Sequence, residues 1–145
     1  SLEESQFVLL DYMAVKQDYR KQGLGSEFLK NIYRTTGWKN KLFLMEVEDP
    51  KKGNNQEIRQ RRVYFYRKNG AKILKKVHYI LPPLQGNTST DMILLVLAQN
   101  RPLWLSGDAI KDLLIQIYRE LYSRDETDPL LKSSLDSVPQ RVELG

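Results

Sequence analysis

The chain has 145 residues, a length that suits one domain with a buried core, and its composition, 41% hydrophobic and 28% charged, is ordinary for a soluble globular protein. Because it contains no cysteine and a single histidine, disulfides, thiolate metal sites, histidine metal clusters and a cysteine nucleophile are excluded. The formal net charge of +5 suggests an anionic ligand, although on charge alone a solvated helix face is the simpler interpretation.

The first part of the chain alternates strand and helix patterns. A nearly continuous apolar run over 7–15, interrupted by Asp11, predicts a strand buried on both faces. After a polar stretch and two glycines, apolar residues at three- and four-residue spacing predict a helix from Ser26 that stops near Gly37. A second apolar run over 42–47 predicts another strand. Since a helical crossover joins parallel strands, we expect these two strands to be parallel.

The middle of the chain predicts a further helix and a strand pair. Basic residues on one side and apolar residues on the other predict a helix over 56–69, with Gly70 as its natural end. Strands are predicted over 71–81 and 92–98, separated by a turn-rich loop that begins with two prolines. We expect these two strands to form a hairpin.

The C-terminal part predicts one more helix and then little regular structure. Ser106 is a suitable N-cap for a helix with a clear apolar stripe. From Ser123 onward the periodicity is lost. We therefore expect a folded domain over 1–122 and a tail or loosely packed extension over 123–145.

The clearest chemical signal lies between the first strand and the first helix, where the loop reads Arg20-Lys21-Gln22-Gly23-Leu24-Gly25. Glycines let the backbone approach a ligand closely, and a helix N-terminus offers free N–H groups and the positive end of its dipole. This arrangement suits a pyrophosphate. A glycine pair is nevertheless common in turns, and the loop is neither a Walker A loop nor a complete Rossmann fingerprint.

Two motifs in order resemble the GCN5-related N-acetyltransferases, the GNAT superfamily. The sequence LLDYMAVKQDYRKQGLGSEFL, at 9–29, is similar to the family's acetyl-CoA motif of strand, R-x-x-G-x-G and helix. The sequence VYFYRKNGA, at 63–71, is similar to its F-Y-x-x-x-G-F helix end, with Ala71 in place of the usual aromatic residue. The resemblance covers about residues 7–98. It implies an α/β (α+β) fold, a GNAT-like mixed β-sheet flanked by helices.

The resemblance also implies a binding site for acetyl-CoA as cosubstrate, with no metal. Backbone N–H groups of residues 21–26 would hold the pyrophosphate of coenzyme A. The end of the first strand would pair with the pantetheine arm, and the N–H of Met13 would face the acetyl carbonyl. The implied acetyl-CoA-binding residues are Met13, Val15, Arg20, Lys21, Gln22, Gly23, Leu24, Gly25 and Ser26.

Three residues are implied for catalysis. Tyr66 matches the family's tyrosine that protonates the leaving thiolate, and its alternative interpretation is a core aromatic of an amphipathic helix. A carboxylate is expected as the general base, and we rank Glu46, late in the second predicted strand, above Asp11. Burial would raise the pKa of either group toward a useful range. The alternatives are a solvent-facing strand edge for Glu46 and a salt bridge or cap for Asp11.

Two functions follow from the resemblance: acetyl transfer from acetyl-CoA to a primary amine by direct attack, and a catalytically inactive coenzyme A-binding or regulatory module. The family's N-terminal strands have no counterpart in residues 1–6, so we expect the acceptor site to be incomplete or built from elsewhere. The basic stretch over 59–76 is expected to be a rim for the phosphates of coenzyme A and not a nucleic-acid surface. The amine acceptor and a homodimer remain open. With no apolar run of membrane length and no signal peptide, we expect a cytoplasmic protein.

Overall fold

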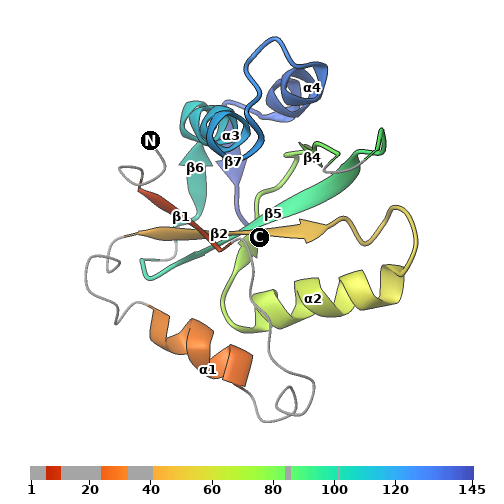
Figure 1. Cartoon of the computed structure of the whole chain (residues 1–145). Helices are drawn as coiled ribbons and strands as arrows, with labels where there is room; N and C mark the ends of the chain where they lie inside the picture. Colours follow the sequence, from red (N-terminus) through yellow and green to blue (C-terminus); the bar gives the residue numbers. More distant parts are fainter. Residues whose placement is uncertain (1–5, 11–23, 33–40, 84–85, 101) are drawn as a thin grey trace.

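The computed structural model describes residues 6–10, 24–32, 41–83, 86–100 and 102–145 (Figure 1). Within these ranges the chain forms strands and helices in the order β1 (Phe7–Leu10), α1 (Leu24–Asn31), β2 (Leu42–Glu48), α2 (Gln56–Lys68), β3 (Lys72–Ile73), β4 (Tyr79–Leu81), β5 (Thr90–Ala98), β6 (Trp104–Ser106), α3 (Gly107–Tyr122), α4 (Pro129–Ser137) and β7 (Arg141–Glu143).

The main sheet is mixed, as predicted. Strand β1 pairs parallel with β2, and β5 pairs antiparallel with β2 on one side and with β3 and β4 on the other. The parallel pair and the hairpin predicted from the sequence are therefore both confirmed. Strand β5 is the centre of the sheet, and its residues Leu94 and Leu95 are fully buried on opposite faces.

One predicted strand is wrong in its middle. The strand expected over 71–81 is two short strands, because five residues separate Ile73 from Tyr79 while only two separate their β5 partners, Leu95 and Met92. The extra residues loop out, and Lys76 takes a left-handed backbone conformation with φ 68°. Such a bulge redirects the strand without leaving the sheet.

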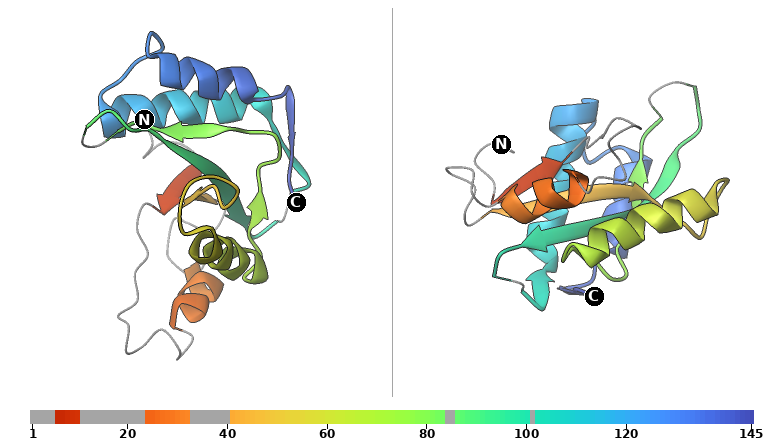
Figure 2. Two further views of the ribbon diagram at one scale, coloured as in Figure 1. Left: turned by 90° about the vertical axis from the view of Figure 1, so that its right-hand side faces the viewer. Right: turned by 90° about the horizontal axis from the view of Figure 1, so that it is seen from below.

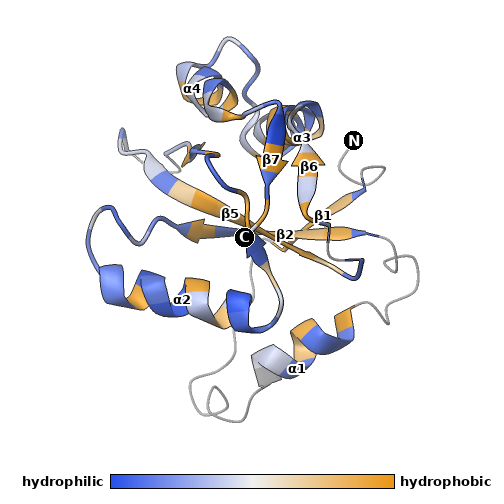
Figure 3. Cartoon of the chain, turned by 180° about the vertical axis from the view of Figure 1, so that it is seen from behind, coloured by the Kyte–Doolittle hydropathy of each residue, from blue (hydrophilic) through white to orange (hydrophobic). Residues whose placement is uncertain are grey.

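Helices cover both faces of the main sheet (Figure 2). The side chains of β2 alternate between the two faces, as the two-residue period of a strand requires. Phe43 and Met45 join a buried cluster with Leu29 of α1 and Val63 of α2. The other cluster is larger and includes Leu44 of β2, Leu94 of β5, Leu113 and Tyr118 of α3, and Leu131 of α4. Figure 3 shows hydrophobic colours along β2 and β5 and mostly hydrophilic colours on α2.

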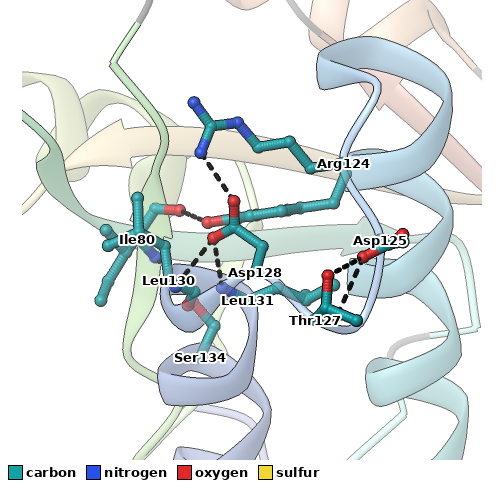
Figure 4. A network of polar contacts seen from close by, with 9 residues as sticks. Ile80, Arg124, Asp125, Thr127, Asp128, Leu130, Leu131 and Ser134 are labelled. Carbon is teal, nitrogen blue, oxygen red and sulfur yellow. Dashed lines mark hydrogen bonds and ion pairs between the residues drawn. The ribbon is translucent and has the colours of Figure 1, made fainter.

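The C-terminal segment is folded, so the expectation of a loosely packed tail is wrong. Helix α4 begins with Pro129 after the N-cap Asp128, whose Oδ1 accepts hydrogen bonds from the N–H groups of Leu130 (2.8 Å) and Leu131 (3.4 Å) (Figure 4). Strand β7 pairs with β6. Leu131 and Val142 are completely buried in the larger cluster, which shows that this segment completes the core.

The N-terminus of α3 is stabilised by a backbone hydrogen bond and not by the predicted Ser106 cap. Ser106 occupies the N-cap position, but its side chain makes no capping hydrogen bond. Instead the N–H of Gly107 donates to the carbonyl of Gln140 at 2.8 Å. A Cβ atom at residue 107 would lie 2.0 Å from the carbonyl oxygen of Pro139, so only glycine permits this close approach.

The same C-terminal segment satisfies the backbone of the broken strand. The N–H of Ile73 donates to the carbonyl of Gly145 at 2.7 Å, and the N–H of Gly145 donates back at 3.1 Å. In helix α4, Ser134 Oγ accepts from the N–H of Ile80 at 3.1 Å and Ser137 Oγ accepts from that of His78 at 2.9 Å. Residues that follow α3 therefore cover both parts of an otherwise exposed sheet edge.

Candidate active site

The candidate site lies where the described pairing of β1 with β2 ends. The two strands pair residue by residue from Phe7 opposite Leu42 to Leu10 opposite Met45. The next residue of β2 is Glu46, which pairs only with β5 within the described part of the chain. The first turn of α1 and the end of α2 lie side by side, below the sheet in the view of Figure 1.

Asn69 joins these two helices. Its side-chain Nδ2 donates to Ser26 Oγ in the first turn of α1 at 3.1 Å and to the carbonyl of Phe65 at 2.9 Å. This contact holds a residue implied for coenzyme A binding close to the turn of α2 that carries Tyr66. Asn69 is not among the site residues predicted from the sequence, although an asparagine directly before Gly70 is a recognisable helix-end signal. Gly70, with φ 100°, ends the helix as predicted.

Tyr66 lies on the face of the sheet covered by α1 and α2. It is half-buried, packs against the cluster that contains Met45 and Val47, and contacts Phe65 edge-on with the ring centroids 5.3 Å apart. Burial raises the pKa of the Tyr66 phenol, and the positive charge of Arg62 opposes that rise. The phenol is therefore neutral at ordinary pH and able to donate a proton, while part of its ring serves the core.

Glu46 lies on the opposite face, which α3 and α4 cover. Its Oε1 atom is buried, so the alternative of a solvent-facing edge does not describe this carboxylate. Glu48, two residues later on the same strand, is different: its Oε2 forms an ion pair with Arg59 of α2 at 2.7 Å. Glu46 therefore places one carboxylate oxygen in the core, whereas Glu48 is engaged by Arg59.

The structure thus brings only part of the predicted site together. Leu24, Gly25 and Ser26 form the first turn of α1, which begins two residues earlier than predicted. Tyr66 and Glu46 lie on opposite sides of the sheet. The remaining predicted residues lie outside the described part of the chain, as does the predicted helix stop at Gly37; they are Asp11, Met13, Val15, Arg20, Lys21, Gln22 and Gly23.

Helix α2 carries a basic surface near the site. Two of its arginines have acidic partners: Arg59 binds Glu48, and Arg61 binds Glu57 at 2.7 Å. Three further cations on the helix are exposed and have no acidic partner among the described residues; they are Arg62, Arg67 and Lys68. A cluster of uncompensated charge at the end of α2 favours an anionic ligand there.

Metal-binding clusters and membrane-spanning helices are both absent from the described ranges. No three acidic or histidine side chains there are grouped in a way that could hold a metal ion. None of the helices described is both long and apolar enough to cross a membrane.

Comparison with known proteins gives one informative match. No family model matches the sequence, and no curated protein matches it. A solved structure from Bacteroides thetaiotaomicron, of a protein assigned to the GNAT family of acetyltransferases, superposes with a TM-score of 0.65 and 21% identity over 83% of this chain. The chain spans 62% of that protein's length. The likeness shows that this chain has the mixed α/β fold of GNAT acetyltransferases, as the two motifs predicted.

Proposed function

We propose that this chain, with its GNAT acetyltransferase fold, is an acyl-CoA-dependent N-acyltransferase that moves an acetyl group from acetyl-CoA to a primary amine. The observation that carries the proposal is the hydrogen bond between Asn69 and Ser26, 3.1 Å long, which joins the two motifs that resemble the family. Because Asn69 also donates to the carbonyl of Phe65, next to Tyr66, this contact supports a site shared by the end of α2 and the start of α1. A fold alone does not imply a function, but this juxtaposition of motif residues supports one.

Binding of the cosubstrate would use charge and free backbone donors. The first turn of α1 has N–H groups without intrahelical partners and the positive end of the helix dipole, both of which favour a phosphate. The uncompensated cations of α2 would add long-range attraction to the phosphates of coenzyme A. Arg20, Lys21, Gln22 and Gly23 complete the proposed phosphate loop, and Met13 and Val15 the proposed contacts to the pantetheine arm and acetyl carbonyl.

The chemistry would be a direct displacement. A neutral amine attacks the thioester carbonyl, a C–N bond forms, and the C–S bond of the tetrahedral intermediate breaks. Glu46, reached from the opposite face of the sheet where the described β1–β2 pairing ends, would take the proton that the amine nitrogen loses. Tyr66 would give a proton to the thiolate that leaves. The raised pKa of Tyr66 keeps its proton in place until the thiolate needs it. We keep Asp11 as the second candidate for the base.

The test measures thiol release from acetyl-CoA in the presence of a panel of primary amines, from small polyamines to peptides. We expect turnover with at least one amine, and we expect Tyr66→Phe to lower kcat by about 100-fold, the lower end of a general-acid contribution. Tyr64→Phe is the matched control, because Tyr64 lies on the same helix with 68% of its surface exposed.

The outcomes separate the two functions that the sequence left open. Binding of coenzyme A without turnover on any amine would favour a catalytically inactive coenzyme A-binding module. Absence of coenzyme A binding, measured by calorimetry, would contradict the enzyme and the module together.

A further inference from the structure

The outer edge of β6 is open. Strand β6 pairs with β7 on one side, and no described strand pairs with it on the other. In both views of Figure 2 it lies at the periphery of the molecule. Two consecutive large apolar residues are exposed there, Leu103 by 71% and Trp104 by 46%. An open edge with exposed apolar side chains is a surface on which another strand can pair.

Backbone groups on this edge are available for such pairing. The carbonyl of Leu103 and the N–H of Gly107 bond to the segment that contains β7, at 3.1 Å and 2.8 Å. In an antiparallel pair, alternate residues direct both their N–H and their C=O toward the neighbouring strand. Trp104 and Ser106 therefore direct these groups to the open edge, where neither N–H forms a hydrogen bond with the described part of the chain.

The strand itself carries nothing that opposes the approach of another strand. Unpaired edge strands are commonly protected by lysine, another charge or proline, whereas β6 reads Trp-Leu-Ser. Arg141 of β7 lies over the Trp104 ring, 4.4 Å from its centroid, and its charge is compensated by Glu143 at 3.2 Å. This stacking holds the ring in position while part of it stays exposed.

A second copy of β6 matches this edge residue by residue. In an antiparallel pair related by a two-fold axis at Leu105, Trp104 of each copy lies opposite the partner's Ser106. The N–H of Ser106 then donates to the carbonyl of the partner's Trp104, and the symmetric bond forms as well. A large side chain also faces a small one, so that each Trp104 ring packs over a serine. On the other face the two Leu105 side chains, each partly buried in its own larger cluster, meet at the axis.

We propose that the chain forms a two-fold dimer by antiparallel pairing of β6 with β6 of a second copy. The pairing joins both copies into one sheet, because the segment of β7 is in turn bonded to that of β3, where the N–H of Lys75 donates to Glu143 at 2.9 Å. The dimer does not depend on the proposed function. Since each edge strand has three residues, the interface is small, and its dissociation constant is expected in the micromolar range.

The test measures the oligomeric state by sedimentation equilibrium from low to high micromolar concentration and compares Ser106→Pro with Ser106→Ala. Ser106 has φ −62° and ψ 133°, which proline adopts without strain, and its side chain makes no capping hydrogen bond. Ser106→Pro therefore keeps the fold of each copy but removes both Ser106 hydrogen bonds across the interface, and its dissociation constant should rise by about 30-fold. Ser106→Ala keeps the N–H and should dimerise like the wild type.

Hydrogen exchange of the wild type locates the interface without any variant. The Ser106 amide gains an acceptor in the dimer, so its exchange should slow as the protein concentration rises. The Gly107 amide is the internal control, because it is bonded within each copy at 2.8 Å and should be protected at every concentration.

Two results would overturn the proposal. A chain that is monomeric at every concentration would leave the edge of β6 to a strand of another protein. A dimer that Ser106→Pro does not weaken, or in which exchange of the Ser106 amide is independent of concentration, would use a different surface. Because exchange is measured on the wild type, the proposal stays testable even if Ser106→Pro does not fold.

Discussion

Individual side chains in this protein serve the core and the proposed chemistry at once. Tyr66 packs with Phe65 over the α1–α2 face, and the burial that this packing imposes also raises the pKa of its phenol. The core interpretation and the acid interpretation of this residue are therefore compatible. Tyr66 and Ser26 were predicted from the motifs. Asn69, which joins their helices, stands at a variable position of the second motif, and its role was found only from the structure.

At the residue scale we predict the pH dependence of turnover. The Tyr66 phenol must be protonated to act, so activity falls as pH rises through its pKa, which burial places above the ordinary value of 10.0. Arg62 lowers that pKa by its charge, so Arg62→Gln should move the basic limb of the kcat profile to higher pH. The measurement covers about pH 8 to about pH 11. A limb that moves to lower pH in the variant would contradict the assignment of Tyr66 as the acid.

Helix α4 shows how a short element is stabilised by its ends. Its sequence has no strong amphipathic period, but Asp128 caps its first turn, and Arg124 binds the same carboxylate at 2.7 Å (Figure 4). Nearby, Thr127 donates its N–H to Asp125 Oδ1 at 2.9 Å, which shapes the turn that leads into the helix. Local capping of this kind makes a helix of nine residues possible once its apolar side has a core to join.

At the element scale we predict the effect of removing this cap. Burial raises the pKa of Asp128, but hydrogen bonds from Arg124 and from the N–H groups of Leu130 and Leu131 together lower it below its usual value. The carboxylate therefore stabilises the fold above its unfolded pKa, and this contribution is lost as pH falls through its lower folded pKa.

Asp128→Ala should reduce the free energy of unfolding by about 1 kcal/mol at neutral pH, and Asp128→Asn, which keeps the acceptor oxygen, should reduce it less. Urea denaturation at neutral pH and near pH 3 measures both effects. The difference between wild type and Asp128→Asn should shrink at the lower pH, and a difference that grows there would contradict the sign of the pKa shift.

In the whole molecule, the sheet is completed by residues remote in sequence. The last residues pair with β3, where the N–H of Ile73 donates to Gly145 at 2.7 Å and that of Lys75 to Glu143 at 2.9 Å. Val142 and Leu144 contribute to the same core as α3. The segment that follows residue 123 therefore supplies hydrogen bonds to the edge of the main sheet and side chains to the larger buried cluster.

At the scale of the molecule we predict the result of deleting residues 141–145. The amides of Ile73 and Lys75 lose their acceptors. The buried side chains of Val142 and Leu144 are also lost, and removal of a buried leucine side chain lowers the free energy of unfolding by about 2 to 5 kcal/mol. Hydrogen exchange should show loss of protection at these two amides, together with a lower melting temperature. The β2–β5 ladder is the internal control, because its hydrogen bonds do not involve the deleted residues. Unchanged protection of Ile73 would contradict this account of the edge.

The sequence by itself determined the parts of this protein that rest on local pattern. Apolar periodicity predicted β2, β5, α2 and α3, the crossover predicted a parallel pair, and the paired motifs predicted the GNAT fold. These features are local because periodicity, helix ends and glycine loops depend on neighbouring residues.

Only the tertiary structure decided the features that depend on distant partners. Strands of three residues such as β6 and β7 are too short to show a period in the sequence, and they form because each supplies the hydrogen bonds of the other across a long stretch of chain. The burial of Tyr79 has the same origin. It depends on the residues that loop out between β3 and β4 and offset β4 along β5, and on the ring of Tyr118 from α3, which packs against it.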